Sequence, residues 1–142
     1  MKLEFLYCKH CKKIIVTLKN DQNVPTICCG EPMTPITANT VDAAREKHVP
    51  DVKVSGNQIE VVVGSVEHPM LPEHWIEFIV LETRKGFQIK YLNAGDKPKA
   101  VFTVVDDEAV AVYEHCNLHG LWKTALRSEE HTSELQSPSL IS

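Results

Sequence analysis

The chain has 142 residues, 43% of them hydrophobic and 24% charged, with a formal net charge of −4, the ordinary balance of a soluble globular protein. Its longest apolar stretches, such as residues 59–66, are too short to cross a bilayer, and no basic stripe offers a surface to nucleic acid. The N-terminus carries an early acid and lacks the continuous apolar core of a secretory signal. We therefore expect a cytoplasmic protein with neither membrane nor nucleic-acid partners.

Residues 1–37 contain four of the five cysteines and are expected to form a small metal module. Residues 4–8 and 13–18 are predicted strands on either side of a Cys-Lys-His-Cys turn, and three lysines crowd this turn: Lys9, Lys12 and Lys13. A segment this small cannot bury enough apolar surface to fold without a staple. Cytosolic thiols stay reduced, and an odd number of cysteines cannot all pair, so metal ligation is the better use for them.

From residue 38 to residue 126 the pattern changes to short β-branched and aromatic runs separated by Gly, Pro, Asn and Asp. The predicted strands are 58–66, 74–82, 86–92, 100–105 and 109–115. Strands that follow one another at this spacing are typical of an antiparallel sandwich. Only residues 41–47 have a briefly helical pattern. The predicted fold class is therefore all-β, a small metal module followed by an antiparallel β-sandwich.

The last segment, residues 127–142, is rich in Ser and Glu and has no apolar periodicity. Its string Arg-Ser-Glu-Glu-His-Thr-Ser-Glu-Leu-Gln-Ser resembles the translation of a common sequencing-library adapter. We interpret the segment as a non-native, disordered tail, which removes His131 from the candidate ligands.

The first candidate metal site is Cys8-x-x-Cys11 followed by the adjacent pair Cys28-Cys29. A Cys-x-x-Cys turn lets two thiolates face one tetrahedral ion, and two further cysteines complete a shell suited to iron or zinc. Adjacent cysteines on one ion strain the backbone, and Gly30 is placed to absorb that strain. The spacing indicates a metal strongly, but it leaves a structural zinc ribbon open as the alternative to iron.

The second candidate site combines Cys116 and His119, three residues apart, with three more histidines. His68 and His74 bracket a proline-rich loop, and His48 lies in Glu-Lys-His-Val-Pro. Each histidine alone is more often an ordinary polar residue than a ligand, and Cys116 alone is more often an inert buried thiol. Together they favour a metal. Two further histidines are interpreted as ordinary residues: His10 as a turn residue, and His115 as a residue that faces away from Cys116 on its strand.

The order Cys-x-x-Cys, Cys-Cys, Glu-Lys-His, His-Pro-Met, His-Trp, Cys-Asn-x-His resembles desulfoferrodoxin, the two-iron class of superoxide reductases, over residues 1 to about 126. The resemblance implies a desulforedoxin-like module with a rubredoxin-like iron, followed by an immunoglobulin-like sandwich. The first iron would then be bound by Cys8, Cys11, Cys28 and Cys29. The second would have an equator of imidazoles and one axial thiolate: His48, His68, His74, His119 and Cys116.

By the same resemblance the chain would be an enzyme that reduces superoxide to hydrogen peroxide by one electron, and so detoxifies it under oxidative stress. Lys47 would steer superoxide to the open position and support proton delivery, and Glu46 would occupy that position in the oxidised site. A small redox protein such as rubredoxin would supply the electron, and a homodimer would be the assembly.

Three other functions fit parts of the pattern. An electron carrier would need no complete second site, yet no ligand position is missing. A zinc-stabilised interaction domain needs closed tetrahedral shells, whereas the second set offers five ligands. A superoxide dismutase must also oxidise superoxide, and an electron-donating thiolate opposes that half-reaction. The sequence favours the reductase over all three.

Overall fold

The computed structural model describes residues 3–19, 21 and 23–126. Its regular structure is almost entirely β-strand, with one single-turn helix, α1, at Arg45–His48. This confirms the predicted all-β class. The chain separates into two compact units, one that ends at Thr37 and one that begins at Ala38, and each is described by itself. Arg127–Ser142, interpreted above as a non-native tail, and His131 within it lie outside the described residues.

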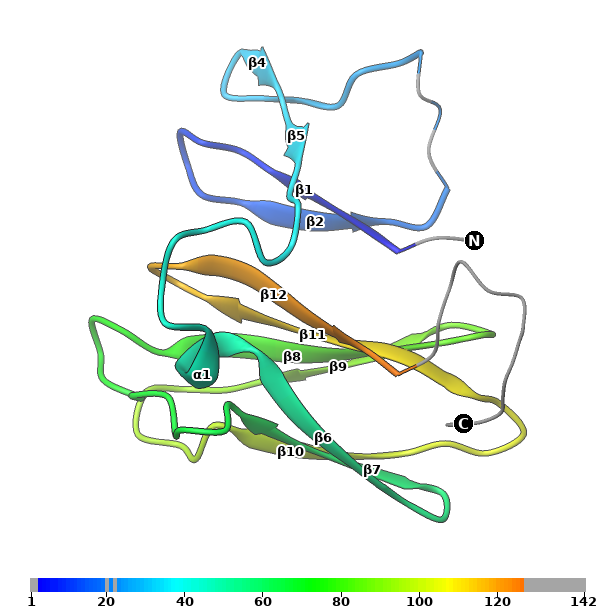
Figure 1. Ribbon diagram of the computed structural model, residues 1–142. Coiled ribbons are helices and arrows are strands. Elements are labelled where there is room, and N and C mark those ends of the chain that lie inside the picture. The colour runs from blue at the N-terminus through cyan, green and yellow to red at the C-terminus, as the bar shows by residue number, and fades with distance from the viewer. Residues whose placement is uncertain (1–2, 20, 22, 127–142) are drawn as a thin grey trace. The chain divides into compact units, whose positions relative to one another are not determined.

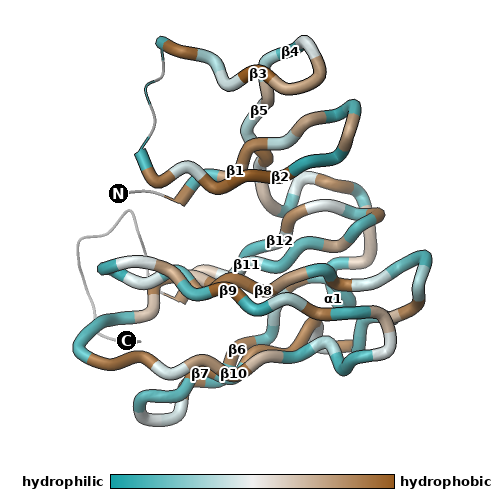
Figure 2. Tube along the Cα trace, turned by 180° about the vertical axis from the view of Figure 1, so that it is seen from behind, coloured by the Kyte–Doolittle hydropathy of each residue, from teal (hydrophilic) through white to brown (hydrophobic). Residues whose placement is uncertain are grey.

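The first unit is built on a β-hairpin. Its strands are β1 Glu4–Tyr7, β2 Ile14–Thr17, β3 Ile27–Cys28, β4 Glu31–Pro32 and β5 Thr34–Pro35. They form an antiparallel sheet in the order β2-β1-β5 and a separate β3-β4 ribbon. Figure 2 shows the hydrophobic residues gathered on β1 and β2. Among the described residues of this unit, the buried cluster consists of Leu6, Cys8 and Met33, with Ile15 and Cys28 packed against it. A core this small is of the kind that a bound metal stabilises.

The second unit is a sandwich of two antiparallel sheets, which face each other in Figure 1. Its strands are β6 Pro50–Ser55, β7 Gln58–Val63, β8 Ile76–Thr83, β9 Phe87–Tyr91, β10 Lys99–Thr103, β11 Ala109–Cys116 and β12 Gly120–Ala125. One sheet has the order β10-β7-β6 and the other the order β12-β11-β8-β9.

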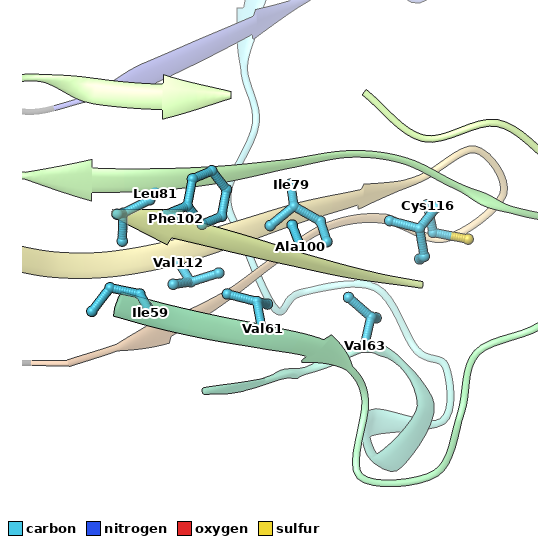
Figure 3. Packing of buried hydrophobic residues seen from close by; sticks show 10 residues of the cluster. Ile59, Val61, Val63, Ile79, Leu81, Ala100, Phe102, Val112 and Cys116 are labelled. Atoms are coloured by element: carbon cyan, nitrogen blue, oxygen red, sulfur yellow. The ribbon is translucent and has the colours of Figure 1, made fainter. Parts of the chain in front are cut away.

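The core of the sandwich lies between these sheets. On β7 the alternate residues Ile59, Val61 and Val63 are buried, and they meet residues of the opposite sheet such as Leu81 and Val112. Alternation along a strand puts every second side chain on the same face. Burying each of these side chains contributes roughly 1.5–3 kcal/mol. Figure 3 shows the sulfur of Cys116 at one end of this row, so the core positions a ligand as well as stabilising the fold.

The prediction missed β6 and β12 and misplaced the helix. β6 begins at Pro50 and is mostly exposed, so it lacks the apolar run that marks a strand; proline is tolerated there because it is the first residue of an edge strand. The helix was predicted at residues 41–47 but occupies only Arg45–His48, with Ala44 extended and no side-chain cap. One turn is too short for a periodic signal.

Candidate metal centres

The four cysteines of the first unit converge. Cys8 follows β1, Cys11 lies in the hairpin turn, and Cys28 and Cys29 come from the β3–β4 ribbon. Their sulfurs all lie within 4.8 Å of one another, and Cys11 Sγ is 3.6 Å from Cys28 Sγ. Four sulfurs at about 2.3 Å from one tetrahedral ion would be about 3.8 Å apart. The structure therefore brings together all four predicted ligands at a spacing that fits one metal ion.

Two consecutive residues at this site have a left-handed backbone conformation, and one of them is a candidate ligand. Gly30 has the expected positive φ of 81°, and Cys29 itself has a φ of 53°. A non-glycine residue rarely adopts this left-handed conformation unless its surroundings impose it. The adjacent-cysteine geometry is therefore achieved by two consecutive left-handed residues, of which sequence analysis identified only the glycine.

The thiols of the first site cannot all ionise without a cation. The pKa of Cys8 falls to about 6, chiefly because the Cys11 backbone N–H donates to its sulfur. The pKa of Cys28 rises to about 12 because the sulfurs of Cys11 and Cys8 share hydrogen bonds with its protonated form. A metal ion displaces these protons and neutralises the thiolates. All five cysteines of the chain lie in the described part, and all are free of disulfides.

Four imidazoles form a closed ring in the second unit. Neighbouring ring centroids are 4.6 Å apart for His48–His68, 4.7 Å for His68–His74, 5.1 Å for His74–His119 and 4.9 Å for His48–His119. Each of these pairs is close to perpendicular, whereas the opposite rings of His48 and His74 are 6.4 Å apart and inclined by 29°. A ring of this size and orientation could hold one metal ion between its four imidazoles.

The nitrogens inside the ring need a cation between them. Nδ1 of His48 lies 2.7 Å from the Ala44 carbonyl, and Nδ1 of His68 lies 2.6 Å from the Pro69 carbonyl. A carbonyl only accepts, so each Nδ1 carries the proton and each Nε2 presents a lone pair. These two Nε2 atoms are 3.2 Å apart. The pair is therefore repulsive without an ion, whereas ligands about 2.1 Å from one ion and at right angles would be about 3.0 Å apart.

Two further observations support the fit. Within the described part of the chain, His74 Nε2 is buried and has no hydrogen-bond partner. Nδ1 of His119 lies 3.1 Å from His48 Nε2 and 3.9 Å from Cys116 Sγ. His119 therefore faces the centre of the ring with Nδ1, whereas His48 and His68 face it with Nε2. Ligand atoms of three histidines and the cysteine lie within 4.8 Å of one another: His48, His68, His74 and Cys116.

Comparison with known proteins decides the family. The family model for desulfoferrodoxin matches residues 40–125. Desulfoferrodoxin of Clostridium acetobutylicum is 48% identical over 108 residues, 76% of this chain and 85% of that protein, and that of Nitratidesulfovibrio vulgaris is 44% identical over 120 residues, 84% and 94%. This chain belongs to the desulfoferrodoxin family. The crystal structure of the superoxide reductase from Treponema pallidum is 38% identical and matches with a TM-score of 0.76, covering 87% of this chain and 99% of that one.

The family and the geometry agree on the metal. The four-cysteine group and the histidine–cysteine group match the two iron sites of desulfoferrodoxin. The resemblance recognised in the sequence, and with it the iron cofactors, is therefore confirmed. The second site draws on residues from α1, the β7–β8 loop, β11 and the β11–β12 turn.

Cys116 is the innermost residue of the second site and is fully buried. Burial raises the pKa of its thiol, and the backbone N–H groups of Leu118 and His119, which donate to the sulfur, act in the opposite direction. A register shift between His115 and Cys116 in the β11–β8 pairing re-aims the last residue of the strand. Glu114 is also fully buried, with neither carboxylate oxygen bonded within the described chain, and burial raises its pKa well above the usual range.

Asn117 fastens the loops that carry the histidines, a role that sequence analysis did not assign. Its side-chain oxygen accepts from the Trp75 backbone N–H at 2.9 Å, and its side-chain nitrogen donates to the Glu73 carbonyl at 3.1 Å. These bonds join the turn of Cys116 and His119 to the segment on either side of His74. The Cys-Asn-x-His motif contained the signal, because an amide side chain can donate and accept at once.

Glu46 and Lys47 lie exposed on α1, directly before the buried His48. The positive charge of Lys47 contributes to lowering the pKa of His48 and of His74, behind burial as the main cause. The ammonium therefore acts on two opposite members of the ring. Gly64 packs against the backbone of this segment, and a Cβ there would lie 2.6 Å from the Glu46 carbonyl oxygen.

The two histidines interpreted as ordinary lie outside the ring. His115 Nδ1 is 2.7 Å from a Glu77 carboxylate oxygen, and its ring stacks on Phe78. His10 Nε2 is 2.6 Å from Glu31 at the first site. His10 is thus a partner of the ribbon that carries Cys28 and Cys29, which its position inside the Cys-x-x-Cys turn did not indicate.

The buried imidazoles make the metal-free fold sensitive to acid. Burial is the main cause that lowers the pKa of His68 to about 4, against a usual value of 6.5. Between these values the unfolded chain binds the proton and the folded chain does not, so stability is present above about pH 6.5 and is lost as the pH falls toward 4. We expect the metal-free protein to lose about 3 kcal/mol over this range from His68 alone.

Urea denaturation of the metal-free protein at several pH values measures this loss. His68→Asn, which cannot titrate, is the matched variant, and its free energy of unfolding is expected to vary less between pH 4 and 6.5 than that of the parent chain. Equal pH dependence in the two proteins would show that His68 is not held neutral.

Proposed function

We propose that this protein is a superoxide reductase that converts superoxide to hydrogen peroxide with one electron and two protons. The closed ring of four imidazoles above a buried cysteine carries the proposal, and the similarity to the superoxide reductase from Treponema pallidum supports it. In this proposal the iron module is residues 1–37 and the enzymatic sandwich is residues 38–126.

The proposed ligand sets are those derived from the sequence. The first iron is bound by Cys8, Cys11, Cys28 and Cys29, and the second by His48, His68, His74, His119 and Cys116. Iron bound at the second site would supply the electron that reduces superoxide. Burial lowers the pKa of His48, His68 and His74, so that these imidazoles are neutral, their lone pairs are available to the metal and the site stays cationic toward an anionic substrate.

We propose that side chains at the exposed edge of the ring attract the substrate and deliver protons to it. His74 and His119 are only partly buried, whereas His48 and His68 are closed off from solvent. We infer that superoxide would approach from this solvent-facing side, because Cys116 is fully buried. In this proposal Lys47 attracts the anion and donates a proton to it, and Glu46, its neighbour on α1, binds the second iron once product has left.

Lys47→Ala is expected to lower the second-order rate constant with superoxide about tenfold at low ionic strength and to flatten its salt dependence. A fixed positive charge near a site raises the encounter rate with an anion, and salt screens that attraction over about 10 Å. Pulse radiolysis on the iron-loaded protein measures the constant. Lys53→Ala is the matched control, because Lys53 is an exposed lysine on β6. Equal effects of the two substitutions would contradict the proposed role of Lys47.

The reaction itself is tested by counting product. With an excess of a reducing donor, a reductase yields one hydrogen peroxide for each superoxide consumed, whereas a dismutase yields one for every two. We expect the ratio to approach one for the iron-loaded chain. A ratio of one half that does not depend on the donor would establish dismutation instead.

We further propose that a small redox protein such as rubredoxin supplies the electrons, that the first iron relays them, and that the protein works as a cytoplasmic homodimer in superoxide detoxification. The free state of all five cysteines supports a reducing compartment. In the part of the chain that the structure describes, no helix is long and apolar enough to cross a membrane. Sedimentation equilibrium of the iron-loaded chain tests the dimer, since a monomer mass at micromolar concentration would contradict it.

A further inference from the structure

We propose that the lysine rim of the four-cysteine site, defined as Lys9, Lys12 and Lys13, is the docking surface for an acidic electron-donor protein. The inference rests on the proposed function, since it names the place where the donor of that reaction binds. The superoxide chemistry uses neither these lysines nor the solvent-facing side of the first site.

Charge is segregated along the chain. Residues 1–37 carry five lysines against three acidic residues, a net charge of +2. Residues 38–126, which leave out the segment interpreted as a non-native tail, carry nine basic and thirteen acidic residues, a net charge of −4. The acidic majority repels an acidic donor, so the small basic unit is the part that attracts it. Such local fields steer encounter even when the net charge has the opposite sign.

The sulfurs of the first site are unequally exposed. Cys8 is buried, whereas Cys11 and Cys29 are exposed to solvent. Lys9 precedes Cys11 by two residues, and Lys12 follows it directly in the same turn. Figure 2 shows a hydrophilic stretch at this turn between β1 and β2. The thiolates through which an electron would enter therefore reach the surface where the lysines are.

The rim keeps most of its positive charge. Glu31 forms an ion pair with one lysine of the rim. The Glu31 carboxylate lies 3.5 Å from Lys9 Nζ and 2.6 Å from His10 Nε2. Lys12 has a left-handed φ of 70°, and its Nζ lies 5.9 Å from the centre of the Tyr7 ring. Among residues 3–19, 21 and 23–126, neither Lys12 nor Lys13 forms a salt bridge. Two lysines thus remain to pair with carboxylates of a partner.

The step that docking serves is a simple electron transfer. The reduced donor would lose one electron, and ferric iron held by the four cysteines would become ferrous. No bond forms or breaks, and no proton moves. The donor class is therefore a one-electron carrier with an acidic face around its own redox group.

The test uses the full iron-loaded chain and reduced rubredoxin of acidic net charge as the probe. Stopped-flow absorbance follows the loss of the ferric-thiolate band of the first site. The triple substitution Lys9→Gln, Lys12→Gln, Lys13→Gln is compared with a control at three exposed lysines of the second unit: Lys53→Gln, Lys85→Gln, Lys99→Gln. At low ionic strength we expect the second-order rate constant to fall at least about tenfold for the rim variant and less than about twofold for the control.

Reduction by methyl viologen radical cation separates docking from driving force. We expect the rim variant to react with this cation as fast as the parent chain or faster, because the substitution removes repulsion rather than reducibility. Equal rates of rim and control variants with rubredoxin, or a rim variant slowed equally by both reductants, would overturn the proposal. The superoxide rate constant of protein reduced beforehand tests the proposed function separately, and it is expected to be the same in all three chains.

Discussion

Cys116→Ser is expected to lower the rate constant for superoxide reduction by more than about 100-fold, since loss of a mere supporting hydrogen bond around a metal already costs about 10–100-fold. Cys116 is fully buried at the end of the sandwich core, on the inner side of the imidazole ring. Serine has nearly the same size, but its hydroxyl does not ionise at neutral pH and donates far less electron density. The substitution would therefore remove the thiolate that is proposed to bind the second iron, while it leaves the packing almost unchanged.

The first site provides an internal control for this variant. Because the four cysteines belong to the unit that ends at Thr37, the red ferric-thiolate spectrum of that site is expected to persist while the additional band of the oxidised second site disappears. Pulse radiolysis gives the rate constant, and iron analysis gives the occupancy of both sites. Full activity in a variant that retains two irons would remove Cys116 from the mechanism.

Gly64→Ala is the second substitution with a large expected effect. Its Cβ would lie 2.6 Å from the Glu46 carbonyl oxygen and 3.0 Å from both the Lys47 carbonyl carbon and the Val49 carbonyl oxygen. All three are backbone atoms of the segment around His48, so the clash cannot be relieved by a side chain. Overpacking of this kind typically costs about 1–3 kcal/mol. We expect the segment to shift, with weaker iron binding at the second site and a lower melting temperature.

Gly86→Ala is the matched control, because no atom lies within 4 Å of a Cβ built at Gly86. We expect its melting temperature to stay close to that of the parent chain. Calorimetry of both variants, together with the iron content of the second site after dialysis against a chelator, measures the two effects. If Gly64→Ala kept both stability and iron, the close approach of the loop to α1 would not constrain the site.

The sequence predicted most of the sandwich, because strands such as β7 and β11 carry apolar residues in the alternating or continuous patterns of half-buried and buried strands. It missed β6 and β12, which are edge strands in the order of their sheets. The other two edge strands, β9 and β10, were predicted, so an edge position alone does not hide a strand. β6 was missed because it is mostly exposed and lacks an apolar run. α1 was misplaced because a single turn without a side-chain cap is too short to give a periodic signal.

The two metal sites were also predicted only in part: the sequence indicated the ligands but not the residues that support them. Ligand types and spacing indicated both metal positions, because thiols and imidazoles in such numbers have few other uses. The features that support them come from residues distant in the chain: Asn117 binds Glu73 and Trp75, and Gly64 approaches Glu46. Glu114 could not be anticipated either, since an acid inside a strand is ordinarily assigned to the solvent face. Only the register of β11 against its neighbours shows that it lies inside.

Trp122 gives the second site a natural optical reporter. Its ring stacks on His48 with centroids 5.0 Å apart, and its Nε1 donates to the His119 carbonyl at 3.1 Å. An indole so close to the metal ligands will have its fluorescence quenched when a redox-active ion occupies the ring. The other tryptophan, Trp75, donates to Leu92 and can be distinguished by comparison with Trp122→Phe. Metal loading of the second site can therefore be followed by light emission in the unlabelled protein, without waiting for turnover.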